Sequence, residues 1–296
     1  MLTKTILIAA LTAAVTASPL ASVGVPDALT STGVPDALTQ TGVPIPGPES
    51  TGFVTSVKSA GTPTATGGIL GNPNAQPNKA LPSDSTLVSE LLNAPSTLKR
   101  FEAIQKNLDA GVIDLKFDFN PAANPAITPG AGGQVDLANR VNFPLLTGTG
   151  ISFAGIFFQP CGLNTPHIHP RATEFLTVAT DSNILSGFVL ENPLTTEFNT
   201  TLTQYQGTVF PQGSIHFQQN LDCKPAVALA GLNSEDPGAS SLAQRFLVNI
   251  DPQVVDATLG FPNEINADNF KTFKANIPAP LAQGVEECLI RCHIPY

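Results

Sequence analysis

Three of the chain's four histidines fall in two short segments, together with one glutamate. His167 and His169 alternate within an extended run, and residues i and i+2 of a strand point to the same face. Glu174 follows a turn that contains Pro170, so it can return to that face on the next strand. His216 lies on a later strand that closure of a barrel can bring opposite the pair. Three imidazoles and one carboxylate form a ligand set for a divalent transition metal.

This ligand set leaves room for chemistry at the metal. With four protein ligands in an octahedral shell, two positions stay open for water, oxygen or a substrate. The alternative is that the histidines are ordinary core residues with satisfied hydrogen bonds. A lone His-x-His pair would favour that alternative, but two segments with an acid at a suitable offset favour a metal site. Ligand type alone does not separate manganese from iron, zinc, copper or nickel.

The segments around these residues predict an all-β core. Short apolar or alternating runs are separated by turn residues such as Pro160-Cys161-Gly162 and Pro211-Gln212-Gly213. Many short strands at this spacing favour a sandwich or barrel over alternating strands and helices. Besides the His-x-His strand, the runs expected to form strands are 115–119, 151–158, 174–180, 184–190, 198–204, 207–210, 214–219, 225–232 and 245–249.

Short helices are predicted on both sides of this core. Ser83 or Asp84 can cap a first helix over 87–92, and Ser96 can cap a second. The second helix carries apolar residues at helical spacing, namely Leu98, Phe101, Ile104 and Leu108. After Phe261 the pattern is again helical, around 267–274 and 279–292. We therefore expect one domain over residues 83–296, with a β-barrel and small helical flanks.

The N-terminal part has the features of a secretory signal followed by a linker. Residues 1–17 combine a short basic start, an apolar run and small residues before Ser18. An ordinary buried helix is the alternative, but Pro19 and a low-complexity tract follow directly. The apolar run is too short to cross a bilayer, and no later segment is long enough. Residues 18–82 are rich in Pro, Thr and Gly, a composition that cannot bury enough apolar surface to fold.

The charge balance excludes two classes of partner. The chain has 14 basic and 23 acidic residues, which gives a formal net charge of −9. It therefore lacks the basic surface that binds nucleic acid. The same balance disfavours binding to anionic membranes. A small molecule is the partner that the candidate site predicts.

All four cysteines lie after residue 160, and an even number in an exported chain predicts two disulfides. Three pairings are open. We favour Cys161–Cys223, which would join the ends of the histidine-bearing strands, with Cys288–Cys292 as the second bridge. A Cys-x-x-x-Cys zinc or redox site is the alternative for Cys288 and Cys292. Asn199 begins an Asn-Thr-Thr sequon, so we expect a glycan there.

Two segments resemble the sequence boxes of the germin-like cupins. Thr165-Pro166-His167-Ile168-His169-Pro170-Arg171-Ala172-Thr173-Glu174 resembles the first box, and Pro211-x-Gly213-x-x-His216-x-x-x-Asn220 resembles the second. The resemblance covers about residues 85–260 and, with 233–238, is nearest to the spherulin-like branch. It implies a single double-stranded β-helix, or jelly-roll barrel, and a secreted protein that forms trimers, or hexamers built from trimers. It also implies manganese held by His167, His169, Glu174 and His216.

The chain departs from the germin-like pattern at a few positions. Asp181 and Tyr205 stand where the family has glycine, which we interpret as loop or strand-length adjustments that leave the ligands intact. Germins that oxidise oxalate use two asparagines near the metal. Asn164 resembles one of them, but the other falls on Thr147. This departure disfavours oxalate oxidation.

Manganese held by three imidazoles and one carboxylate can cycle between its +2 and +3 states. We therefore expect extracellular redox chemistry on a small oxygen species, with superoxide dismutation as the simplest version. Asn164 would orient a bound water or anion, in a cavity lined by Phe153, Phe175, Phe188 or Phe217. Oxalate oxidation is the second enzymatic interpretation. A metal-stabilised cell-wall, spore-wall or carbohydrate-binding protein without turnover is the alternative from a different class.

Overall fold

The computed structural model describes residues 70–260 and 274–296. The predicted signal sequence, the predicted linker up to residue 69 and nearly all of the predicted helix at 267–274 lie outside the described residues. Among the described residues, no helix has the length and apolar character that crossing a membrane requires.

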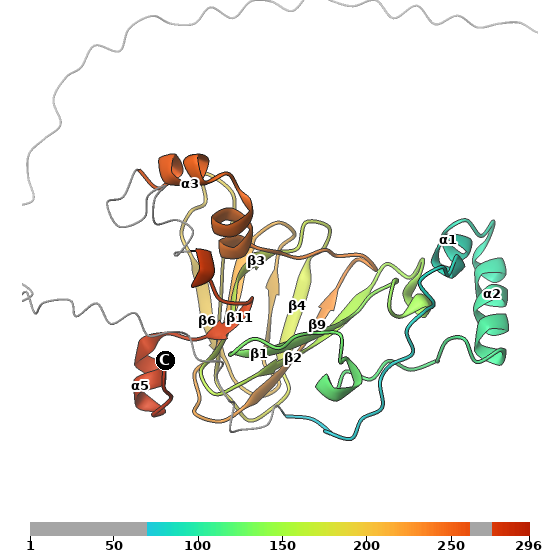
Figure 1. Cartoon of the computed structure of the whole chain (residues 1–296), viewed down its shortest axis with the longest axis horizontal. Coiled ribbons are helices and arrows are strands. Elements are labelled where there is room, and N and C mark those ends of the chain that lie inside the picture. The colour runs from blue at the N-terminus through green and yellow to red at the C-terminus, as the bar shows by residue number, and fades with distance from the viewer. Residues whose placement is uncertain (1–69, 261–273) are drawn as a thin grey trace, which may run out of the picture. The chain divides into compact units, whose positions relative to one another are not determined.

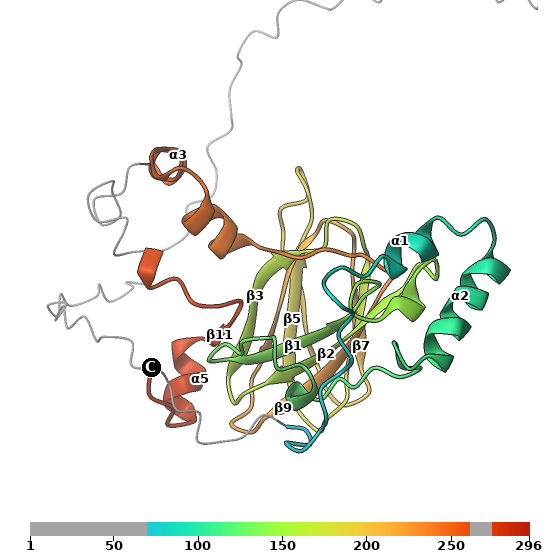
Figure 2. The same ribbon diagram turned by 45° about the vertical axis from the view of Figure 1, so that its right-hand side comes forward.

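Two antiparallel sheets enclose the core (Figure 1). The first has the spatial order β1 (Gly133–Ala138), β2 (Ser152–Phe158), β9 (Ala226–Leu232), β4 (Glu174–Val178) and β7 (Gly207–Phe210). The second has the order β10 (Ser240–Ser241), β3 (Gly162–Ile168), β8 (Ile215–Asn220), β5 (Ile184–Val189) and β6 (Phe198–Leu202), and β11 (Leu281–Gln283) also pairs with β3. Figure 2 shows β3 and β5 of the second sheet together with β1 and β2 of the first. The predicted jelly-roll barrel is confirmed.

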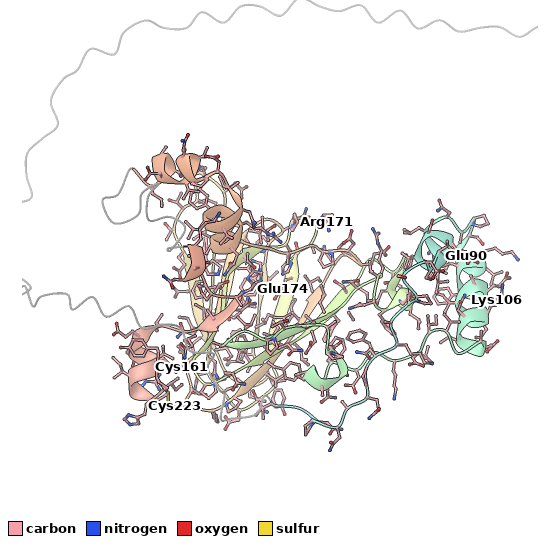
Figure 3. The ribbon with its side chains drawn as sticks, in the orientation of Figure 1. Glu90, Lys106, Cys161, Arg171, Glu174 and Cys223 are labelled. Carbon is pink, nitrogen blue, oxygen red and sulfur yellow. A yellow bond between two sulfur atoms is a disulfide. The ribbon has the colours of Figure 1, made fainter. Side chains whose placement is uncertain are left out.

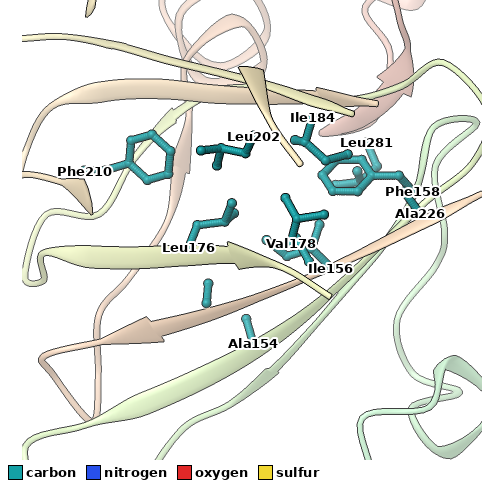
Figure 4. Packing of buried hydrophobic residues seen from close by; sticks show 12 residues of the cluster. Ala154, Ile156, Phe158, Leu176, Val178, Ile184, Leu202, Phe210, Ala226 and Leu281 are labelled. Atoms are coloured by element: carbon teal, nitrogen blue, oxygen red, sulfur yellow. The ribbon is translucent and has the colours of Figure 1, made fainter. Parts of the chain in front are cut away.

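The apolar core lies between the two sheets (Figure 4). In β9 every second residue is buried, which is the alternation expected of a strand with one face on the core. In β4 the inward positions are Glu174, Leu176 and Val178, so the glutamate shares a face with core residues. The core combines residues of both sheets, namely Ala154, Ile156, Phe158, Leu176, Val178, Ile184, Leu202, Phe210, Ala226, Ala228, Ala230 and Leu281.

The two N-terminal helices form where the sequence predicts them. They are α1 (Leu87–Leu92) and α2 (Thr97–Asp109). Ser96 caps α2, because its side chain accepts a hydrogen bond from the backbone N–H of Lys99 at 3.2 Å. Thr86 holds the N-cap position of α1 without a side-chain hydrogen bond, so the expected cap by Ser83 or Asp84 was wrong. Leu98 and Phe101 of α2 are exposed, and Ile104 is the buried residue of this helix.

Part of the predicted linker contacts the folded unit. Asn78 donates from its backbone N–H to Ala123 O at 2.9 Å and from Nδ2 to Asp118 O at 2.8 Å. Leu81 packs against the apolar cluster of α1 and α2. Asn78 and Leu81 of the predicted linker therefore contact residues of the predicted domain.

Several predicted elements have a different structure. Residues 115–119 do not form a strand, because Asp118 N–H pairs with the Asn78 side chain instead of a ladder partner. Residues 245–249 lie in a π-helix, η3 (Gln244–Asn249), which precedes α3 (Pro252–Thr258). The helix predicted over 279–292 is split into β11 and α5 (Glu286–Arg291). β1 and the short 3-10 turns η1 (Pro121–Ala123) and η2 (Pro144–Leu146) were not predicted from the sequence.

Candidate metal centre

A bulge in β3 puts two side chains on the inner face that a regular strand would separate. Asn164 lies opposite Gln218 and His167 lies opposite His216, so the register of β3 against β8 shifts between them. Residues three apart point to opposite faces of a regular strand. The one extra residue in β3, at Thr165–Pro166, turns His167 back to the face on which Asn164 lies. As a result, Asn164 and His167 line the same cavity.

Three imidazoles and one carboxylate meet inside the barrel, and Figure 3 marks Glu174 there. Glu174 Oε2 lies 2.8 Å from His169 Nε2 and 3.5 Å from His216 Nε2. The ring centroids of His167 and His216 are 4.2 Å apart. One ligand atom from each of the four residues lies within 4.8 Å of the others, and all four residues are buried. The structure thus brings together the four residues that the sequence selects.

Backbone carbonyls fix the orientation of each imidazole. Each Nδ1 lies at hydrogen-bonding distance from a carbonyl oxygen: His167 at 2.8 Å from Thr165, His169 at 2.6 Å from Gly238, and His216 at 2.9 Å from Ser214. A carbonyl oxygen only accepts, so each Nδ1 carries a proton and donates it. In the neutral rings, Nε2 is therefore left with its lone pair for a metal.

Burial and neighbouring charges set the protonation of the cluster. Burial and the charge of His216 lower the pKa of His167 to about 3, so this ring is neutral at ordinary pH. Burial also favours neutral His169, but the hydrogen bond and charge of Glu174 outweigh it and raise its pKa above 6.5. Burial opposes ionisation of Glu174, yet its hydrogen bond with His169 and the nearby ring of His216 lower its pKa to about 2. A cation entering at a pH below the pKa of His169 must therefore displace a proton from that ring.

Two buried polar atoms of the cluster, Glu174 Oε1 and His216 Nε2, have no hydrogen-bond partner among the described residues. Leaving such an atom unsatisfied costs about 1–3 kcal/mol, and one cation held by the cluster would satisfy both. Imidazole nitrogens with a carboxylate oxygen suit divalent transition metals. The structure therefore has a His₃–Glu site that could bind a metal.

Two arginines hold the loop whose carbonyl orients His169. Arg171 donates from Nε to Asp236 O at 2.8 Å and from Nη2 to Asp236 Oδ1 at 2.9 Å. Arg140 Nη2 donates to Asp236 Oδ2 at 3.2 Å. Gly238 has a φ of 67°, in the left-handed region that favours glycine. No spacing rule in the sequence connects Gly238 to His169, so the role of Gly238 was missed.

The cluster borders a cavity of about 280 Å³. His167, His169 and Glu174 line it on one side. His216 is not among the lining residues, and its ring stacks on Phe210 at a centroid distance of 4.6 Å. Another part of the lining consists of small and aliphatic residues of β1, β2 and β9, namely Gly133, Val135, Leu137, Ala154, Ile156, Ala230 and Leu232.

The four phenylalanines expected to line the cavity lie elsewhere. Phe153 and Phe175 are 41% and 57% exposed, because they occupy the outward positions of β2 and β4. Phe188 packs against the apolar core, and Phe217 lies against Gly187. Phe153, Phe175 and Phe217 alternate with the inward residues of their strands, whereas Phe188 faces the core without reaching the cavity, so the expectation was wrong.

Asn164 lines the cavity and donates from Nδ2 to Gln218 Oε1 at 2.8 Å. Gln218 was not selected from the sequence, although its position two residues after His216 places it on the same face of β8. Thr147 follows η2 and is not among the residues that line the cavity. Among the described residues that do line it, Asn164 is the one asparagine.

The predicted disulfide pairing was wrong, although all four cysteines are bonded. The bridges are Cys161–Cys288 and Cys223–Cys292, with Cα–Cα distances of 5.8 and 5.1 Å. Cys288 belongs to α5 and Cys292 follows it directly, so each reaches a different cysteine at the end of the barrel. Figure 3 shows Cys161 and Cys223 beside this helix. The i,i+4 spacing that suggested one bridge instead places two bridges side by side, with Cys161 Sγ and Cys292 Sγ 3.4 Å apart.

Asn199 lies on the exposed strand β6. Its Nδ2 donates to Glu197 Oε1 at 3.0 Å. The exposed position is compatible with a glycan, which stays a prediction.

Comparisons with known proteins give matches to a family model, to two curated relatives and to a solved structure. The family model described as Cupin matches residues 119–267. Spherulin-1A of Physarum polycephalum is 35% identical over 215 residues, which cover 72% of this chain and 82% of that protein. Germin-like protein 8-5 of Oryza sativa subsp. japonica is 47% identical over 120 residues, 40% of this chain and 53% of that protein. A solved structure of oxalate oxidase in complex with the substrate analogue glycolate has 26% identity and a TM-score of 0.46, and covers 50% of this chain and 73% of its own.

Proposed function

The chain belongs to the cupin family, and we propose that it is a secreted manganese protein that performs redox chemistry on a small oxygen species. Superoxide dismutation is the reaction to test first. The observation that carries this proposal is the orientation of three buried imidazoles by backbone carbonyls, with Glu174 completing the ligand set.

A bound manganese ion would supply one-electron oxidation and reduction. His167, His169 and His216 would hold it as neutral ligands, and Glu174 would contribute one negative charge. Asn164 keeps one amide hydrogen beyond the one it donates to Gln218, and this hydrogen can hold a water or an anion in the cavity. The aliphatic part of the lining limits the water around that position.

Oxalate oxidation is the second enzymatic candidate. The lining offers one asparagine, and the amide of Gln134, which also lines the cavity, already donates to Asp136 Oδ1 at 2.6 Å. An anion with two carboxylates would therefore lack one of the two amide contacts that the germin-like pattern implies. This arrangement favours superoxide over oxalate.

The wider proposal concerns export and assembly. Two disulfides support a location outside the cell, in agreement with a signal sequence at 1–17. Phe153, Gly231, Phe175 and Val209 are successive neighbours across β2, β9, β4 and β7, and the three apolar side chains among them are exposed. Such an apolar stripe on an outer face supports a homo-oligomer.

The test compares manganese-loaded full chain with His169→Ala. We expect superoxide turnover by the loaded protein and loss of both manganese and turnover in the variant. His293→Asn is the matched control, because His293 is exposed near the C-terminus and asparagine tolerates its positive φ. Full manganese occupancy without turnover of superoxide or oxalate would contradict the proposal and favour a non-catalytic cell-wall, spore-wall or carbohydrate-binding protein.

A further inference from the structure

The two disulfides at the end of the barrel differ in their access to solvent. Cys161 and Cys288 are fully buried, with 0% of each residue exposed. In the second bridge, Cys223 is exposed and Cys292 is half-buried. A thiol in solution attacks a disulfide only at a sulfur atom that it can reach. A small thiol therefore has access to the Cys223–Cys292 bridge but not directly to the Cys161–Cys288 bridge.

The sulfur atoms of the two bridges are in contact. Cys292 Sγ lies 3.4 Å from Cys161 Sγ, although these two atoms belong to different bridges. The Sγ atoms of Cys161, Cys288 and Cys292 all lie within 4.8 Å of one another. Thiol–disulfide exchange proceeds by attack of a thiolate on a disulfide sulfur. Reduction of the exposed bridge would therefore free Cys292 in contact with the sulfur that it has to attack.

Arg291 places a positive charge among these sulfur atoms. Its Nη1 lies 3.7 Å from Cys223 Sγ and 3.9 Å from Cys292 Sγ. Its Nη2 lies 3.4 Å from Cys288 Sγ. A neighbouring cation stabilises a thiolate relative to the thiol. Arg291 therefore favours both an attacking thiolate at Cys292 and a leaving thiolate at Cys288.

The surroundings of Cys288 can also accept a released thiol. Its Sγ lies 3.6 Å from Leu221 O and 3.9 Å from Asn220 O, and carbonyl oxygens accept from an S–H group. Arg291 donates from Nη2 to the same Leu221 O at 2.7 Å and from Nε to Glu287 Oε1 at 3.0 Å. These two hydrogen bonds hold the guanidinium beside the sulfur atoms.

We propose that the four cysteines form a thiol–disulfide exchange site, which passes reduction by a small-molecule thiol from the exposed bridge to the buried one. The small thiolate attacks Cys223 Sγ, forms a mixed disulfide there and releases the thiolate of Cys292. Cys292 then attacks Cys161 Sγ. A Cys161–Cys292 bond forms, the Cys161–Cys288 bond breaks, and Cys288 leaves as a thiolate. A second small thiol attacks the mixed disulfide and releases Cys223.

Electrons and protons balance in this sequence. Two small thiols are oxidised to one disulfide, and the chain gains the two electrons and the two protons that they lose. The products are a Cys161–Cys292 bridge and thiols at Cys223 and Cys288. Cys288 lies within α5 and Cys292 is its C-cap residue. Cys161 is thus bonded to this helix or its cap before and after the exchange, so the chain accepts two electrons while α5 stays attached to the barrel.

The experiment compares Cys223→Ser with Cys292→Ser in the full chain. Each variant removes the same bridge and leaves one thiol, but only Cys223→Ser leaves that thiol in contact with the buried bridge. In Cys223→Ser we expect the thiol to be shared between Cys292 and Cys288, whereas in Cys292→Ser it should stay at Cys223. The thiols are alkylated with a maleimide in acidic denaturant, which stops the exchange. Trypsin cuts after Arg291 and so separates Cys288 from Cys292 for mass spectrometry.

The rate of reduction gives a second comparison. The bridge that remains in Cys223→Ser should be reduced by glutathione at least about tenfold faster than the one in Cys292→Ser, because the internal thiol opens it first. Equal rates in the two variants would contradict the transfer from one bridge to the other.

The parent chain supplies a test that does not depend on the folding of a variant. Partial reduction with glutathione, followed by the same acid quench, should yield peptides in which Cys161 is joined to Cys292. Partly reduced chains that contain only the Cys161–Cys288 bridge would overturn the proposal. Neither result requires manganese, so the proposal fails or stands separately from the function proposed for the His₃–Glu cluster.

Discussion

The cavity has two walls that are built in different ways. The polar wall consists of β3, His169 and the start of β4, with His216 and Gln218 of β8 in contact with it, and its side chains are fixed by hydrogen bonds to carbonyls and amides. The apolar wall consists of β1, β2 and β9, and its residues are held by packing and strand pairing. The polar wall therefore carries the four candidate metal ligands, and the apolar wall determines the shape of the space beside them. Changes on one wall should leave the property of the other intact.

The largest effect is expected on the polar wall, from His216→Ala. This change removes one ligand and the stacking partner of Phe210. The affinity for manganese should fall at least about a hundredfold, and added manganese should no longer raise the melting temperature. Elemental analysis and thermal unfolding with and without the metal measure both. An unchanged metal content would refute the site.

On the apolar wall, Ile156→Ala should lower stability without removing the metal. Ile156 is buried in the core between the sheets and is not one of the four candidate metal ligands. Loss of its buried methyl groups should cost about 2–4 kcal/mol in the free energy of unfolding. Denaturant titration measures this cost, and exposed Ile151→Ala serves as the control. A loss of manganese in folded Ile156→Ala would show that metal binding at the polar wall depends on packing at the apolar wall.

A smaller effect on the polar wall is expected from Asp236→Ala. This carboxylate joins Arg140 and Arg171 and holds the loop that presents the carbonyl of Gly238 to His169. Without it the ring is less well oriented, and manganese affinity should fall about tenfold to a hundredfold. Asp181→Ala removes a similar surface ion pair, to Lys224, and should have no effect. Equal manganese affinities in the two variants would show that this loop does not orient His169 for metal binding.

The smallest effect is expected in the pH dependence of the free energy of unfolding, from a residue on the outward face of β1. Burial raises the pKa of Asp136 on β1 from 3.8 to about 6, with an opposing hydrogen bond from Gln134. The folded state therefore binds this proton more tightly than the unfolded state. The resulting stability is complete below pH 3.8 and is lost as the pH rises through about 6.

Asp136→Asn should remove this dependence. The variant should be more stable than the parent chain at pH 7.5 by on the order of 1–3 kcal/mol, with little difference near pH 4. Denaturant titrations at the two pH values measure the change. A pH dependence that persists in Asp136→Asn would show that another group carries it.

The polar wall was largely predictable from the sequence. His167 and His169 share a face by strand alternation, and His216 and Glu174 complete a ligand set that few other functions require. The bulge at Thr165–Pro166 was not predictable, because no local pattern states how β3 pairs with β8. The same limit applies to the carbonyl of Gly238, which reaches His169 only through the tertiary fold.

The apolar wall was less predictable. Apolar alternation indicates that a residue is buried but does not predict which strand lies next to its own. β1 was missed because the polar residues Gln134 and Asp136 are buried within it. The segment around Phe117 and Phe119 was predicted as a strand, but its rings pack on each other at 4.9 Å outside the ladder. The disulfide pairing failed for the same reason, since the position of α5 depends on the fold.

The most direct measurement of the central claim is anomalous diffraction at the manganese edge from crystals of the full chain grown with the metal. We expect one strong peak within bonding distance of Nε2 of His167, His169 and His216 and of the carboxylate of Glu174. Crystals grown with saturating manganese that show no peak there, or that show these side chains bonded only to one another, would contradict the proposed manganese site.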